Sequence, residues 1–96
     1  MMLVVSYDVN TTDAAGEKRL RKVAKLCEAY GCRVQNSVFE VLVDPAQLVT
    51  LKAGLSEVID KEKDSVRFYR LGSNWRPRIE TLGKELTYEQ DGVIMF

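Results

Sequence analysis

An acidic residue near the end of an apolar run is the first feature of the sequence that could do chemistry. The run "LVVSYDV" covers residues 3–9, and strand alternation places Asp8 on the same face as Val4 and Ser6. Asp is a common turn former, so the acid can simply mark where the strand reaches solvent. The alternative is that the acid is held at the strand end because it binds something.

The chain contains no histidine, the side chain used most often for acid–base catalysis near neutral pH. Hydrolytic chemistry would therefore depend on carboxylates, a metal ion or hydroxyl groups. Cys27 and Cys32 are five positions apart, lack the spacing of a C-x-x-C pair and have no histidine to complete a zinc site. We expect both to be reduced, buried, small hydrophobic residues.

Basic residues are grouped along the chain, although 14 basic and 14 acidic residues give zero net charge. Such a chain is not a general polyanion binder. However, residues 18–25 hold five positive charges and no acid, and residues 65–79 hold four arginines beside aromatic residues. The candidate nucleic-acid contacts are Arg19, Arg21, Lys22, Arg76 and Arg78. A solvated basic helix face explains the first run equally well, and Trp75 could instead anchor the C-terminal segment.

Two helices that would position these residues have clear end signals. Asp13 is placed to cap the first helix, and Gly31 is expected to stop it. The second helix has Asp44 as its N-cap, Pro45 at its first position and Gln47 able to close a capping box.

The remaining segments predict strands. Residues 32–44 indicate two short strands or one bent strand, broken near 35–37 and paired with the first strand, and residues 65–72 alternate as a further strand. The resulting order is strand, helix, strand, strand, helix, strand. It predicts an α+β, ferredoxin-like βαββαβ sandwich with two helices on one face of an antiparallel sheet.

The last 24 residues are not required by that fold. We expect a single domain over residues 1–96, with a core of 1–72 and a C-terminal arm of 73–96. The apolar ending "GVIMF" could form an edge strand, but we expect it to pair with a neighbouring chain, which places the arm at a dimer interface.

Composition favours an ordinary globular chain, with 46% hydrophobic and 29% charged residues. The apolar run at the start is too short for a signal peptide, and no stretch is long enough to span a bilayer. These features predict a cytoplasmic protein that does not enter a membrane.

Several motifs occur together in one order along the chain. They are Tyr7-Asp8-Val9, Gly31, Arg33-Val34-Gln35 and Ser37-Val38-Phe39-Glu40. In this combination the sequence resembles the CRISPR-associated Cas-two family of small nucleases, over nearly its whole length. The resemblance implies a ferredoxin-like homodimer that acts in bacterial or archaeal adaptive immunity against foreign nucleic acid.

The resemblance also implies a site. In the family the strand-end aspartate, which matches Asp8, is the catalytic metal-binding residue and faces its copy across the dimer axis. Other positions tied to activity match Arg33, Ser37 and Phe39, together with Arg19 and Arg21 on the first helix. Mg²⁺ usually takes one or two carboxylates plus substrate phosphate, so two copies of Asp8 would supply a magnesium site, with Mn²⁺ as a possible substitute.

Alternative functions remain open at this point. The family also includes a non-catalytic role, in which the dimer bridges copies of the Cas-one integrase and holds DNA during spacer acquisition. A toxin-like mRNA nuclease is a further alternative. A module that binds RNA through sheet aromatics would have only Tyr7 and Phe39 to use. Phosphate contacts carry no base information, so DNA and RNA substrates are both retained.

Overall fold

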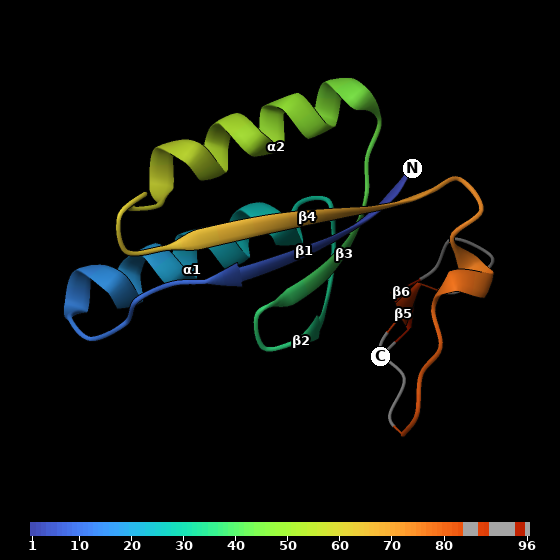
Figure 1. Ribbon diagram of the computed structural model, residues 1–96, viewed down its shortest axis with the longest axis horizontal. Helices are drawn as coiled ribbons and strands as arrows, with labels where there is room; N and C mark the ends of the chain where they lie inside the picture. Colours follow the sequence, from blue (N-terminus) through green and yellow to red (C-terminus); the bar gives the residue numbers. More distant parts are fainter. Residues whose placement is uncertain (84–86, 89–93, 96) are drawn as a thin grey trace.

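Two helices cover one face of a four-stranded antiparallel sheet in the computed structural model of the protein (Figure 1). The structure describes residues 1–83, 87–88 and 94–95. The elements are β1 (Met2–Asp8), α1 (Ala14–Glu28), β2 (Gly31–Gln35), β3 (Val38–Leu42), α2 (Pro45–Val58), β4 (Ser65–Gly72), the 3₁₀ helix η1 (Arg76–Arg78), β5 (Thr87–Tyr88) and β6 (Ile94–Met95). The sheet order β2-β3-β1-β4 confirms the predicted βαββαβ fold.

The central strand β1 presents different residues to the two faces of the sheet. Leu3, Val5 and Tyr7 are buried against the helices. The alternating positions, among them Val4 and Asp8, point to the helix-free face because successive side chains of a strand point in opposite directions. Pairing with both β3 and β4 fixes the register of β1, so it also fixes which face Asp8 occupies.

The core lies between the sheet and the helices. The helices contribute these buried hydrophobic side chains to the core: Val23, Ala24 and Cys27 from α1 and Leu48, Leu51 and Leu55 from α2. Both cysteines are free and buried, as predicted. Burial raises the pKa of Cys27 to about 12 and that of Cys32 to about 11, so both remain thiols at neutral pH.

Both helix starts follow the predicted signals. The Asp13 side chain accepts from the backbone N–H of Gly16, and Asp44 and Gln47 form the capping box. The prediction that Gly31 stops the first helix was wrong, because α1 ends at Glu28 and Gly31 begins β2. Glycine is needed at position 31 for a different reason, because the backbone of β2 passes so close to β3 there that a Cβ would meet the carbonyl oxygen of Glu40.

After β4 the chain forms η1 and then the antiparallel pair of β5 and β6 (Figure 1). Strand β5 contacts β2. Of the segment "GVIMF" (92–96), residues 94–95 form β6 and pair with β5 of the same chain, and residues 92, 93 and 96 lie outside the described residues. Pairing of this segment with a neighbouring chain stays a prediction. Within the described part of the chain, no helix has the length and apolar character needed to cross a membrane.

Candidate active site

Asp8 is the last residue of β1, and its side chain is exposed on the helix-free face. Its neighbours Tyr7 and Val9 are both buried, and its backbone lies opposite Ser65 of β4. Within the described residues, no hydrogen bond or ion pair occupies its carboxylate. A rigid strand end therefore presents a carboxylate that is available to a ligand.

The turn between β2 and β3 closes against this end of β1. The backbone N–H of Tyr7 donates to the carbonyl oxygen of Ser37 at 3.0 Å. The hydroxyl of Tyr7 donates to the carbonyl oxygen of Asn36 at 3.4 Å. Ser37 is half-buried and lies at the same end of the sheet as Asp8.

Arg33 and Phe39 form a second group, on the helix side of the sheet. The Arg33 guanidinium lies 5.3 Å from the centre of the Phe39 ring, and the rings of Phe39 and Tyr7 stack at 6.1 Å. Burial raises the pKa of Tyr7, and the nearby Arg33 guanidinium only partly offsets the rise. Arg33 itself is exposed and presents its charge at the sheet edge.

Phe39 has 0% exposed area and Tyr7 has 4%. Neither ring is displayed on the sheet surface, so the alternative of an RNA-recognition sheet built on these two aromatics was wrong. The four residues predicted to be catalytic thus fall into two groups. Asp8 and Ser37 lie at one end of the sheet, whereas Arg33 and Phe39 contact each other on the face opposite to the Asp8 side chain.

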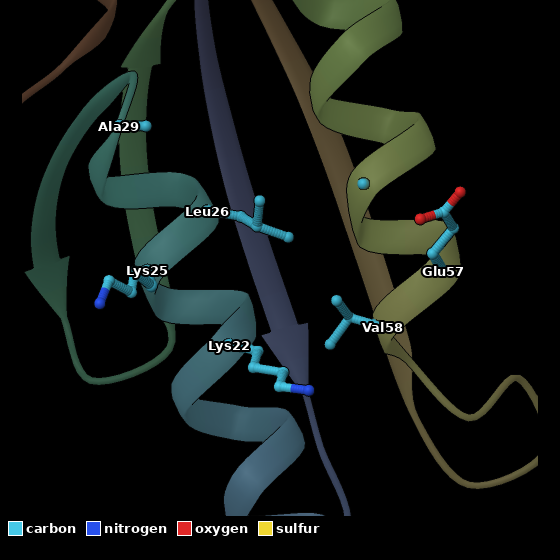
Figure 2. A pocket seen from close by; sticks show the side chains of 7 residues that line it. Lys22, Lys25, Leu26, Ala29, Glu57 and Val58 are labelled. Carbon is cyan, nitrogen blue, oxygen red and sulfur yellow. The ribbon is translucent and has the colours of Figure 1, made fainter.

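The basic residues of α1 differ in their surroundings. Arg19 donates from Nε to Oδ2 of Asp64 at 2.8 Å, so its guanidinium has a partner inside the chain. Arg21 and Lys22 are exposed. Lys22 lines a groove of about 370 Å³ between α1 and α2, into which Leu26 and Val58 point (Figure 2). This groove lies on the helix side of the molecule, away from the face that carries Asp8.

The remaining two predicted contacts belong to η1. Both Arg76 and Arg78 are exposed. The Arg76 guanidinium lies 4.7 Å from the centre of the Trp75 ring, and Nε of Arg78 donates to the carbonyl oxygen of Asn74 at 3.2 Å. Their charges are therefore presented by a short ordered turn beyond β4.

Sequence reasoning missed Asp64, the carboxylate that pairs with Arg19. It is 8% exposed, although it closes a run of charged residues that reads as a solvated loop. Its partner lies 45 positions earlier in the chain, so no local pattern identifies it.

The donor set of one protomer is small. In the ranges that the structure describes, no three His, Cys, Asp or Glu side chains come together as a metal-ligand group. A chain that contributes Asp8 alone therefore needs further oxygen ligands from water, substrate or a second protein chain to hold a divalent cation.

Comparison with known proteins adds to this geometry. Residues 1–79 match the family model described as CRISPR associated protein Cas2. The CRISPR-associated endonuclease Cas2 of Halalkalibacterium halodurans is 49% identical over 96 residues, which is 100% of both chains. The CRISPR-associated endoribonuclease Cas2 of Nitratidesulfovibrio vulgaris is 50% identical over 95 residues, or 99% of this chain and 93% of the relative.

Solved structures give the same result. The fold is similar to that of Streptococcus pyogenes Cas2 at pH 6.5, with a TM-score of 0.79 and 61% identity over 86% of this chain and 100% of the other. It is also similar, at 26% identity and a TM-score of 0.63, to a chain of a partial Cas6-RT-Cas1–Cas2 complex, over 98% of this chain and 94% of the other. On this combined evidence, the chain belongs to the CRISPR-associated Cas2 family.

Proposed function

We propose that the protein is a metal-dependent endonuclease that hydrolyses phosphodiester bonds of DNA or RNA, and that its active form is a homodimer. The observation that carries the proposal is Asp8, an exposed carboxylate without a partner among the described residues, on a strand otherwise fixed in the core. Relatives named endonuclease and endoribonuclease, each about half identical to this chain, support the reaction type.

The helix-free face of the sheet supports the dimer. Leu42 is 40% exposed and Tyr69 is 46% exposed there, beside the half-buried Val4. An isologous interface brings each residue near the two-fold axis into contact with its own copy. An axis passing the end of β1 would bring two copies of Asp8 together, and the C-terminal arm could extend the interface.

The donor chemistry at Asp8 fits Mg²⁺, because a hard cation prefers carboxylate oxygens and keeps several waters. Bound there, Mg²⁺ supplies Lewis-acid polarisation of a phosphoryl oxygen. The two copies of Asp8 would hold the ion, and Ser37 could hydrogen-bond to phosphate or water at the same end of the sheet. Arg33 would contribute positive charge for the nucleic-acid backbone from the sheet edge. The Phe39 ring would hold the Arg33 guanidinium in place through their cation–π contact. Mn²⁺ has similar ligand preferences and is proposed as a substitute.

Cleavage by an Asp8→Asn variant tests the function. With matched single-stranded RNA and duplex DNA in a Mg²⁺ series, we expect the variant to lose at least about 100-fold in rate on whichever substrate the unmodified protein cleaves, while remaining dimeric. Asp60→Asn is the control, because Asn can keep the acceptor that Asp60 offers to the N–H of Glu62. Cleavage by Asp8→Asn at the unmodified rate would contradict the proposal.

A second candidate function is structural. One similar chain comes from a complex that contains Cas1, which favours a role for this protein as a DNA-holding subunit beside a Cas1 integrase. The two functions differ in their dependence on the acid. If bridging alone matters in the cell, Asp8→Asn should support spacer acquisition with Cas1 as well as the unmodified protein does.

A further inference from the structure

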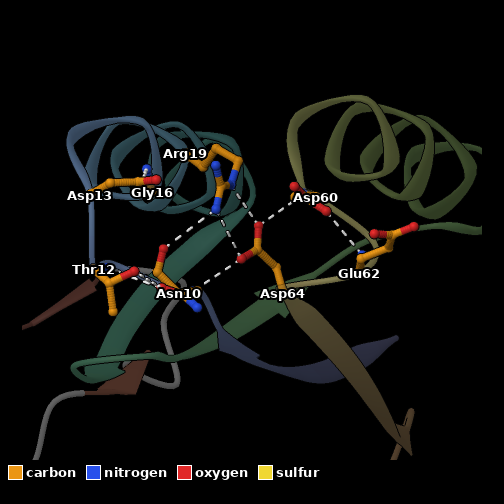
Figure 3. A network of polar contacts seen from close by, with 8 residues as sticks. All are labelled: Asn10, Thr12, Asp13, Gly16, Arg19, Asp60, Glu62 and Asp64. Carbon is orange, nitrogen blue, oxygen red and sulfur yellow. Dashed lines mark hydrogen bonds and ion pairs between the residues drawn. The ribbon is translucent and has the colours of Figure 1, made fainter.

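Asp64 is a buried carboxylate that accepts hydrogen bonds from three separate segments of the chain (Figure 3). It directly precedes β4, and its side chain has no exposed area. Its Oδ2 accepts from Nε of Arg19 at 2.8 Å and from the backbone N–H of Asp60 at 2.9 Å, and its Oδ1 accepts from the backbone N–H of Asn10 at 3.0 Å. The carboxylate thus joins α1, the loop after α2 and the loop after β1.

The pair formed by Arg19 and Asp64 holds both backbone polar groups of Asn10. Asp64 accepts from the N–H of Asn10, and Nη2 of Arg19 donates to its carbonyl oxygen at 3.4 Å. The first turn of α1 approaches the same oxygen so closely that a Cβ at Gly16 would lie 1.8 Å from it. Asn10 is therefore fixed from both sides.

This arrangement confines the backbone around Asp8. Asp8 lies opposite Ser65 in the ladder, and Ser65 directly follows Asp64. Val9 is buried in the core, and Asn10 is held by the ion pair. Asp8 is only two positions from Asn10, so release of Asn10 would change the direction in which the chain leaves β1 and hence the position of the Asp8 carboxylate.

The electrostatics favour a structural task for Asp64. Burial opposes its ionisation, but hydrogen bonds from Arg19 and from the N–H groups of Asp60 and Asn10 outweigh burial and lower its pKa to about 2. Asp64 is therefore charged at neutral pH and does not exchange protons there. With no exposed side-chain area, it is also closed to substrate.

We propose that Asp64 is a positioning residue, which fixes the backbone after β1 and so the position of the Asp8 carboxylate. Arg19 then serves as the ion-pair partner of Asp64 rather than as a nucleic-acid contact. The proposal rests on the nuclease function proposed above. It assigns Arg19 a different task from the exposed Arg21, which remains available to phosphate.

Kinetics of Asp64→Asn test the positioning role. The amide oxygen can still accept from the N–H of Asn10, but the amide NH2 group cannot accept from Nε of Arg19 or from the N–H of Asp60, which both donate to Oδ2. Asn10 should therefore shift rather than be released completely. We expect kcat to fall by about 10- to 100-fold with KM unchanged within about twofold, since misplacement of a reacting group by about 1 Å can cost that much. Arg19→Gln should behave in the same way, and Asp60→Asn should match the unmodified protein. A raised KM with unchanged kcat in Arg19→Gln would overturn the proposal and make Arg19 a substrate contact.

Two measurements on the folded variants separate this proposal from the nuclease proposal. Amide hydrogen exchange at Asn10 should accelerate in Asp64→Asn, with the helices still protected. In the NMR spectrum of the same variant, Mn²⁺ should broaden the Asp8 amide resonance less than it does in the unmodified protein.

If Asp8→Asn cleaves normally, the nuclease proposal fails whatever Asp64 does. If Asp8→Asn is inactive while Asp64→Asn keeps full kcat and full Mn²⁺ broadening, the positioning proposal alone is wrong.

Discussion

Among single residues, Asp8 and Asp64 have different surroundings and different tasks. Asp64 uses its carboxylate entirely inside the chain, with Arg19 and two backbone N–H groups as donors. Asp8 has no such partner among the described residues and is exposed. A satisfied carboxylate stabilises a fold, whereas an unsatisfied one at a rigid position is available for a ligand. We therefore expect substitutions at Asp64 to lower stability and, through the position of Asp8, the reaction rate, and substitutions at Asp8 to lower the rate without lowering stability.

The pKa of Asp64 predicts how stability depends on pH. Its pKa is about 2 in the folded protein, below its ordinary value of 3.8, so the folded state holds its proton less tightly than the unfolded state. The contribution of Asp64 is therefore fully present above about pH 5 and is lost as the pH falls towards about 2. Urea unfolding of the protein and of Asp64→Asn should give a stability difference that is constant near neutral pH and shrinks below about pH 4. A difference that stays constant down to about pH 2 would contradict this assignment.

At the scale of elements, the position of β2 depends on a contact between strands at Gly31. A Cβ at this residue would lie 1.9 Å from the carbonyl oxygen of Glu40 and 2.7 Å from Cα of Val41. These are backbone atoms of the neighbouring strand, so no side chain can move aside to make room. The glycine allows β2 to approach β3 closely, and β2 carries Arg33.

Gly31→Ala should therefore destabilise the protein. We expect the free energy of unfolding to fall by about 1–3 kcal/mol, the usual cost of forcing extra atoms into a packed site. Gly54→Ala is the matched control, because its Cβ would meet only side-chain atoms of Leu26, at 3.5 and 3.6 Å, and alanine favours a helix by about 1 kcal/mol. Urea denaturation of both variants measures the difference. Equal stability of the two variants would show that the contact at Gly31 does not limit the approach of β2.

Local rules predicted most of the elements, and contacts between separate elements explain what they missed. The capping residues Asp13 and Asp44 act on backbone groups within one helical turn, so the sequence displays both partners. The bond from Arg19 to Asp64 joins residues 45 positions apart, and the approach at Gly31 depends on how two neighbouring strands pair, which no pattern within one helical turn displays.

Local sequence patterns also predicted only part of the candidate site. Alternation along β1 correctly places Asp8 on the face shared with Val4, because both lie in one unbroken register with β4. It cannot relate that face to the side chains of β2, because the relation depends on the register between strands. The separation of Asp8 from Arg33 therefore becomes visible only when Arg33 is seen opposite Phe39, which lies in the core.

At the scale of the whole molecule, the two faces of the sheet have different roles. Both helices close one face over a continuous core, whereas the other carries Asp8 together with the exposed Tyr69. Among the described residues, Asp8 belongs to no group of three potential metal ligands, and Mg²⁺ takes one or two carboxylates from a protein together with other oxygen ligands. The proposed magnesium site therefore includes a second copy of the chain that brings its own Asp8 to the same ion.

Two measurements together give the stoichiometry of this site. The protein is titrated with Mn²⁺ while the electron paramagnetic resonance signal of free Mn²⁺ is followed, and its molar mass is measured by light scattering. We predict a dimer that binds one Mn²⁺ per two chains, and an Asp8→Asn dimer that binds none at this site. A monomer, a stoichiometry of one ion per chain, or undiminished binding by Asp8→Asn would contradict this prediction.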